Sequence, residues 1–249
     1  MDPQFLGLLV APPDPAFGLM AAFDADSHPK KVSLIAGAYH DEEGQPHRWL
    51  THLIDLARSL TFGSDITNRL SSNVASLQTV SGTGANHLAA AFLSKQLQPK
   101  RVFIPGPTCR PRGNAILRRR YGRTERHHHP QPCAHNPTGM DLTKSQWIEV
   151  AELVKEKHLF PVFDSAYQGF ATRDVDGDAW AIRYFSERIL SDADSKFPGV
   201  CVAQSFSNNF GLYGERVGAL HLVVPRGLSA EEAKSQLTLM ARGEYWNPP

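Results

Sequence analysis

Cysteine is scarce in this sequence, and long apolar runs are missing. Its three cysteines, Cys109, Cys133 and Cys201, are odd in number and widely spaced. This pattern matches neither a disulfide framework nor a zinc site, and it favours a reducing compartment. A membrane-spanning helix needs roughly 20 consecutive apolar residues, which the sequence lacks, and residues 1–15 have no basic start typical of a secretory signal. We therefore expect a cytoplasmic protein that does not enter a membrane.

Charge of either sign is not in excess. The 26 basic and 25 acidic residues leave a formal net charge of +1, which gives no overall attraction to nucleic acid or to a membrane surface. Residues 110–129 form a local basic stretch that ends in His127-His128-His129. Three consecutive histidines cannot all face one metal from a regular helix or strand, and Tyr121 is the only aromatic residue within the stretch. We interpret the stretch as a solvated loop rather than as a nucleic-acid patch or a metal site.

Apolar segments that could build a core alternate between two kinds of periodicity. Hydrophobic residues make up 41% of the 249 residues, which is ordinary for a soluble globular protein with one large or two small domains. Strands are predicted at 74–80, 101–104, 160–163, 200–205 and 218–224, and helices at 85–96, 143–157, 178–190 and 229–242. This alternation predicts an α/β fold of three layers, in which helices flank a mostly parallel sheet.

Polar groups follow several of the predicted strands, where open α/β sheets place their ligands. These groups are Ser81-Gly82-Thr83-Gly84, Asn136, Asp164, Tyr167, Ser205 and Arg216. A glycine-rich turn at the start of a helix exposes free N–H groups and suits a phosphate. A serine hydroxyl and an arginine guanidinium also suit a phosphate. Taken singly, each group also fits a plain turn, a helix cap or a satisfied buried polar side chain.

Several motifs carry a resemblance to one known family. The stretch 204–218, Gln-Ser-Phe-Ser-Asn-Asn-Phe-Gly-Leu-Tyr-Gly-Glu-Arg-Val-Gly, resembles the cofactor-lysine loop of the aspartate aminotransferases. Residues 78–84 resemble the phosphate cup of that family, and Asn136-Pro137-Thr138-Gly139 and Asp164-Ser165-Ala166-Tyr167 resemble two of its further motifs. The resemblance covers most of residues 10–248, with interruptions after Leu50 and across 110–131. It implies pyridoxal 5'-phosphate (PLP) as cofactor and the large domain of the fold type I PLP enzymes, with an incomplete small domain.

The resemblance also implies roles for individual residues. Asp164 would pair with the pyridinium nitrogen of PLP, and Asn136 and Tyr167 would bond its phenolate oxygen. The residues implied at the phosphate are Ser81, Gly82, Thr83, Ser205 and Arg216. Cys109 stands where the family has a tryptophan on the cofactor ring, and a thiol cannot supply the same stacking area. Gly37 belongs to a turn that lies beside the substrate carboxylate in the family.

The domain organisation follows from the same comparison of motifs. We expect residues 1–50 to be an N-terminal arm and a small-domain remnant. Residues 51–249 would form a truncated PLP-binding large domain with an internal deletion near 110–131. The family builds its active site from two subunits, so a homodimer is expected.

The main departure from the family lies at Asn208, where the cofactor-binding lysine would stand. An amide nitrogen is neither nucleophilic nor basic, so it can neither bond covalently to PLP nor carry the proton that transamination moves. We therefore predict a PLP-binding protein of the transaminase family with impaired catalysis and no covalent tether. Two alternatives stay open. One is an active aminotransferase for L-aspartate and 2-oxoglutarate that recruits another amine, and the other is a non-enzymatic dimerisation or interaction protein.

Overall fold

The computed structural model describes residues 49–103, 131–191, 197–225 and 228–245, together with positions 19, 21–23, 25–28 and 31. The predictions made for Gly37, for Cys109 and for the basic stretch 110–129 lie outside these residues. So does most of the expected N-terminal arm. In the part of the chain that is described, no helix combines the length and the apolar character needed to cross a bilayer.

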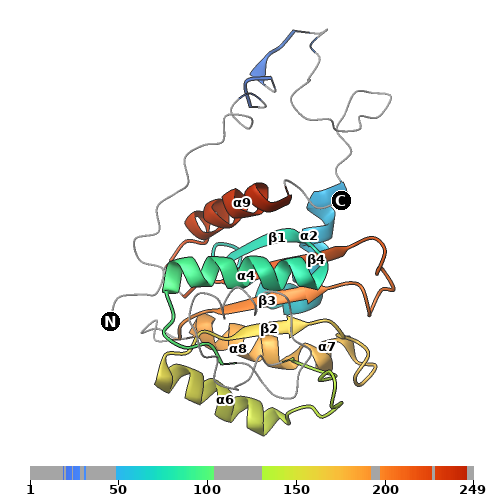
Figure 1. Ribbon diagram of the computed structural model, residues 1–249, viewed down its shortest axis with the longest axis vertical. Coiled ribbons are helices and arrows are strands. Elements are labelled where there is room, and N and C mark those ends of the chain that lie inside the picture. The colour runs from blue at the N-terminus through green and yellow to red at the C-terminus, as the bar shows by residue number, and fades with distance from the viewer. Residues whose placement is uncertain are drawn as a thin grey trace.

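A four-stranded sheet in the order β1-β4-β3-β2 forms the centre of the molecule (Figure 1). Its strands are β1 (Val74–Val80), β2 (Val162–Ser165), β3 (Val200–Ser205) and β4 (Val217–Val223). β2 is parallel to β3, whereas β4 is antiparallel to both β1 and β3. Three of the described strands therefore point the same way, as predicted, but β4 enters between two of them and makes the sheet mixed.

The strand predicted at 101–104 was wrong for its described part. Residues 101–103 have no regular secondary structure. Pro99 and Pro105 bracket this short apolar run, and proline lacks the N–H group that a β-ladder requires. The other four predicted strands are present, with ends that differ by two residues at most.

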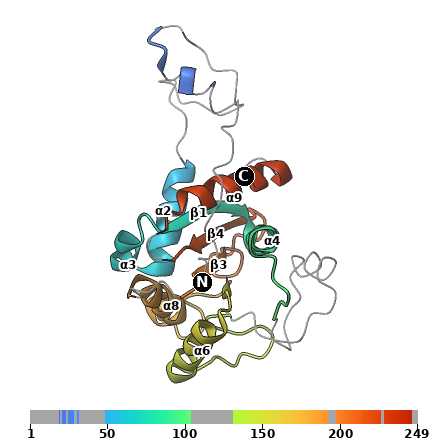
Figure 2. The same cartoon turned by 90° about the vertical axis from the view of Figure 1, so that its left-hand side faces the viewer.

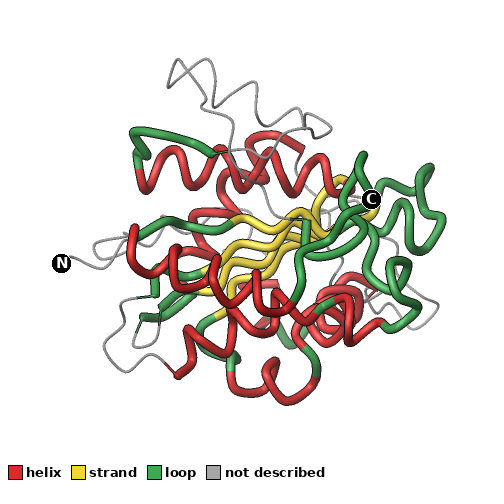
Figure 3. The backbone as a smooth tube through the Cα atoms, turned by 90° about the horizontal axis from the view of Figure 1, so that it is seen from below, coloured by secondary structure: helices red, strands yellow, loops and turns green. Residues whose placement is uncertain are grey.

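Helices cover both faces of the sheet, which gives the predicted three layers (Figures 2 and 3). α4 (Ser81–Leu97) and α9 (Glu231–Tyr245) pack on one face. The opposite face is covered by α2 (Trp49–Phe62), α6 (Lys144–Lys157) and α8 (Trp180–Ser191). Two short helices, α3 (Ser64–Arg69) and α7 (Val175–Asp178), both contact α8.

Aromatic rings fill the core between β2, α6 and α8. Phe163 and Phe185 meet edge to face with their ring centroids 5.1 Å apart, and Trp147 lies 5.6 Å from Phe163. All three side chains are buried, and such pairs add stability beyond the area that they bury. α6 begins where the sequence predicts, because Thr143 and Gln146 form a reciprocal capping box. This packing fixes β2 and therefore the position of Asp164, which lies within it.

Candidate functional site

The polar residues that the sequence singles out lie along one edge of the sheet, the one formed by the ends of its strands rather than by an outer strand. β1, β2 and β3 end at this edge, and β4 begins there, because Val80 pairs with Val217 and Ser205 pairs with Gly218. The loops after β2 and β3 project from the same end of the strands in Figure 1. The antiparallel β4 thus brings Arg216, just before its first residue, to the carboxyl ends of the other strands.

Ser81 joins three segments at this edge. Its N–H donates to the Arg216 carbonyl at 2.8 Å, and its hydroxyl lies 2.8 Å from Ser207 Oγ and 3.4 Å from Ser205 Oγ. Ser81 is buried and has a positive φ of 58°, a conformation that is uncommon outside glycine. Next to it, a Cβ on Gly82 would lie only 2.7 Å from the Cβ of Ser205. The turn and the end of β3 are therefore packed as closely as their backbones allow.

The start of α4 has no side-chain cap. Val80 occupies the N-cap position and its side chain makes no cap bond; the N–H of Ser81 donates to the Arg216 carbonyl, and the N–H groups that follow have no cap from Val80. Such N–H groups need a partner, and together with the helix dipole they favour an anion. Thr83 is exposed in this first turn. The arrangement can accept a phosphate.

Asp164 sits in β2 and is linked to the same turn through Asn86. Burial raises the pKa of the Asp164 carboxyl to about 6, and a hydrogen bond from Asn86 acts against this increase. Asn86 Nδ2 also donates to the Gly82 carbonyl at 3.1 Å. None of the ion pairs among the described residues includes Asp164. The site thus holds a carboxylate that a cationic ligand would stabilise.

Asn86 is a residue of this site that sequence reasoning missed. It lies in α4, four residues after Gly82. A polar residue one helical turn after the glycine-rich motif was the feature of the sequence that could have indicated it. Its side chain bridges the phosphate-type turn and the carboxylate of Asp164. Its position on the inner face of α4 depends on how that helix packs against the sheet.

Asn136 and Tyr167 form a pair. Asn136 Nδ2 donates to Tyr167 Oη at 3.0 Å, and both residues are partly buried. Tyr167 lies two residues after the end of β2, and the backbone N–H of Asn136 donates to the side chain of Gln131. A coupled amide and phenol can bond a ring oxygen of a ligand from one side.

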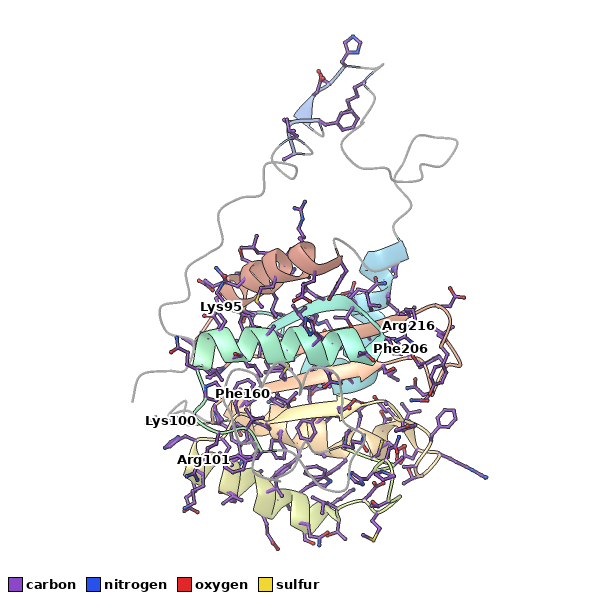
Figure 4. The ribbon with its side chains drawn as sticks, in the orientation of Figure 1. Lys95, Lys100, Arg101, Phe160, Phe206 and Arg216 are labelled. Carbon is purple, nitrogen blue, oxygen red and sulfur yellow. The ribbon has the colours of Figure 1, made fainter. Side chains whose placement is uncertain are left out.

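Asn208 lies in the loop between β3 and β4, and this loop closes on itself. The hydroxyl of Tyr213 donates to Asn208 Oδ1, and Arg216 NH1 donates to the Tyr213 carbonyl at 3.1 Å. Figure 4 shows Arg216 beside Phe206, where β4 begins. Among the described side chains, no carboxylate forms an ion pair with Arg216.

The structure brings some of the predicted residues together and leaves others apart. Ser81, Gly82, Ser205 and Arg216 are in direct contact, and Asp164 is joined to them through Asn86. Asn136 and Tyr167 form a pair of their own, and Asn208 contacts Tyr213 instead. Within the described ranges, no group of three or more His, Cys, Asp or Glu residues could hold a metal ion. The role of these residues toward a cofactor stays a prediction.

Comparison with known proteins places the chain in a family. A family profile described as aminotransferase class I and II matches residues 131–247. Relatives include an L-tyrosine:2-oxoglutarate aminotransferase of Aspergillus ustus, which is 36% identical, with 95% of this chain and 55% of the relative covered. The chloroplastic aspartate aminotransferase of Arabidopsis thaliana is 33% identical, with 99% and 64% covered. The cytoplasmic aspartate aminotransferase of Oryza sativa subsp. japonica is 34% identical, with 98% and 71% covered.

Solved structures agree with the sequence relatives. The cytoplasmic aspartate aminotransferase of Saccharomyces cerevisiae has a TM-score of 0.71 at 30% identity, with 98% of this chain and 72% of that chain covered. An aromatic-amino-acid aminotransferase of Burkholderia pseudomallei, covalently bound to pyridoxal phosphate, has a TM-score of 0.65 at 30% identity, with the same coverage of 98% and 72%. The fold is therefore that of the fold type I PLP-dependent aminotransferases. This chain belongs to the class I and II aminotransferase family, and it spans 55% to 71% of the length of the three relatives named above.

Proposed function

We propose that this chain binds PLP without a covalent bond and transaminates poorly, because Asn208 stands where the family has its cofactor lysine. The single observation that carries the proposal is the convergence of Ser81, Ser205, Arg216 and Asp164 on one edge of the sheet. An anion-accepting turn and a partly buried carboxylate suit the two ends of one cofactor, its phosphate and its ring nitrogen.

The phosphate end fits the residues around α4. The uncapped start of that helix offers free N–H groups. The hydroxyls of Ser81 and Ser205 and the guanidinium of Arg216 would add hydrogen bonds and positive charge. Thr83, exposed in the same turn, would complete the set.

The ring end fits Asp164, Asn136 and Tyr167. A protonated pyridinium beside Asp164 would supply the cation that this carboxylate lacks among its described neighbours. The Asn136–Tyr167 pair would hold the ring oxygen. When bound, PLP supplies an electron sink for the carbanion chemistry of amino acids.

Asn208 cannot carry out the proton transfer that the family's lysine performs. Its amide can hold a hydrogen bond, as it does with Tyr213, but it cannot take the proton from a substrate carbon. Positioned proton transfer is typically worth about 10²–10⁴-fold in rate. We therefore expect transamination of an amino acid and a 2-oxo acid to be slower by at least this factor.

The decisive experiment compares three proteins incubated with PLP, reduced with borohydride and weighed by mass spectrometry. The wild-type chain should bind PLP in an absorbance titration but carry no covalent adduct after reduction. Asn208→Lys should gain one adduct, at position 208. Asn209→Lys is the matched control, because it adds the same amine one residue away and should stay unmodified.

Two outcomes would contradict the proposal. Absence of PLP binding by the wild-type chain would favour a non-enzymatic interaction protein. An adduct on a native lysine of the wild-type chain would favour the active alternative, an aminotransferase for L-aspartate and 2-oxoglutarate. The names of the relatives, which are aspartate and tyrosine aminotransferases, support that alternative.

We also propose that the chain acts as a cytoplasmic homodimer. Phe170, Phe210 and Tyr213 expose more than half of their surface at the edge that holds the site, and exposed apolar groups of this kind suit a protein interface. A cytoplasmic aspartate aminotransferase is among the relatives. Sedimentation equilibrium of the purified chain would decide the oligomeric state.

A further inference from the structure

The loop that follows Tyr167 is held by a single buried carboxylate. Asp178 Oδ2 accepts hydrogen bonds from the N–H groups of Gly169, at 2.8 Å, and Ala171, at 3.0 Å. Its Oδ1 accepts from the N–H of Thr172, at 3.2 Å, and from the hydroxyl of Thr172, at 2.8 Å. Only 3% of Asp178 is exposed, so no bulk water can replace these bonds.

The charge of Asp178 also reaches Cys133, in the segment that carries Asn136. Burial raises the pKa of the Cys133 thiol to about 12, and the Asp178 carboxylate adds to this increase through its negative charge. Cys133 lies three residues before Asn136. Tyr167 therefore begins the loop that Asp178 holds, and its partner Asn136 lies in the segment that the charge of Asp178 reaches.

Gln168 anchors the start of the same loop. Its Nε2 donates to the carbonyls of Leu60, at 2.8 Å, and Val175, at 3.1 Å. Its own carbonyl accepts from Asn209 Nδ2 at 3.4 Å, next to the position of the missing lysine. Gln168 thus anchors the start of the loop, directly after Tyr167, and Asp178 anchors residues 169–172.

We propose that Asp178 is a positioning residue that holds the Tyr167 hydroxyl, together with Asn136, in the orientation that bonds the cofactor ring oxygen. This inference rests on the proposed function and deepens it. Asp178 ends α7, and its carboxylate accepts hydrogen bonds from residues 169–172 rather than contacting the cofactor, so it would act on the cofactor only through Tyr167.

The first test uses the protein without any cofactor. Hydrogen exchange followed by mass spectrometry should show that Asp178→Asn speeds amide exchange in residues 167–172 by about tenfold or more, because a buried charge-assisted acceptor is lost. Thr143→Ala is the matched control. It removes the cap of α6 but none of the hydrogen bonds of Asp178, so it should lower overall stability without this local change.

The second test is a double-mutant cycle with pyridoxamine phosphate as the ligand. Asp178→Asn should weaken binding by about tenfold when Tyr167 is present and by less than about twofold in the Tyr167→Phe background. If Asp178→Asn does not fold, Thr172→Val takes its place, because it removes one bond to Asp178 and leaves the carboxylate with its other donors.

Three results would count against the inference in distinguishable ways. Unchanged exchange in residues 167–172 would overturn the claim that Asp178 holds the loop. An equal loss of affinity in both Tyr167 backgrounds would assign Asp178 a general structural role. A wild-type chain that does not bind pyridoxamine phosphate would refute the proposed function, and the cofactor role of Asp178 with it, whatever the exchange data show.

Discussion

At the scale of single residues, the carboxylate of Asp164 destabilises the folded state at neutral pH but suits a cationic ligand. Its pKa rises to about 6 in the fold from an ordinary value of 3.8. Between these values the unfolded chain has already lost its proton while the folded chain still keeps it. Stability therefore falls as pH rises through this window, and it stays lower above about pH 6.

Replacing Asp164 by Asn should therefore stabilise the protein without cofactor at neutral pH. The shift from 3.8 to about 6 corresponds to at most about 3 kcal/mol. Thermal melts at about pH 7.5 should show a higher Tm for Asp164→Asn, and the gain should vanish near pH 3.5. The same variant should bind pyridoxamine phosphate more weakly. A Tm at or below that of the wild-type chain at neutral pH would contradict this account.

The sequence predicted the polar groups at the strand ends, but not their neighbours. Asp164 and Ser81 could be found because each lies at or just beyond the end of an apolar strand. His221 shows what could not be found. It is buried within β4, where its ring bonds Ser76 at 2.9 Å and Gln204 at 3.1 Å. Burial and the charge of Arg58, in α2, lower its pKa to about 3, and both effects depend on elements that only the fold brings together.

At the scale of elements, the turn between β1 and α4 depends on close approach to β4. A Cβ on Gly218 would lie 2.5 Å from the backbone carbon of Ser81 and 2.7 Å from the carbonyl oxygen of Gln204. Because these are backbone atoms, they cannot rotate away as a side chain would. Gly218 is therefore the residue that lets the two elements share the site.

Replacing Gly218 by Ala should move the β1–α4 turn away from β4. We expect a loss of about 1–3 kcal/mol in the free energy of unfolding, the usual range for overpacking. Denaturant unfolding gives the measurement, and a titration with inorganic phosphate or PLP should also show weaker binding. Gly214→Ala is the control, because its Cβ would meet nothing within 4 Å. Equal effects from the two variants would argue against the role given to Gly218.

Helices and strands were predictable where local pattern decides them, but their order in the sheet was not. α6 and α9 begin within two residues of the predicted positions. The insertion of β4 between β1 and β3 depends instead on contacts between residues far apart in the chain. The prediction that was wrong for residues 101–103 has the same origin, because an apolar run becomes a strand only when a neighbouring strand can pair with it.

At the scale of the whole molecule, the sheet and its two helical layers form the frame, and a cofactor would stabilise all of it. A ligand that binds only the folded state adds about 2.7 kcal/mol when its concentration is 100 times Kd. For a chain of this size, that corresponds to a rise in Tm of roughly 5–10 °C. We expect this rise with PLP and only a small one with pyridoxal, which lacks the phosphate. Equal shifts with the two compounds would show that the turn between β1 and α4, which holds Ser81, and Arg216 do not form a phosphate site.

The loop between β3 and β4 leaves the sheet and returns to it at the same edge, with Ser205 at its first end and Arg216 at its last. A change within the loop therefore need not shift either end of it, because the paired strands hold both ends in register. This geometry makes the identity of residue 208 nearly independent of the scaffold around it. Selection could relax on the chemistry at that position while the fold persisted.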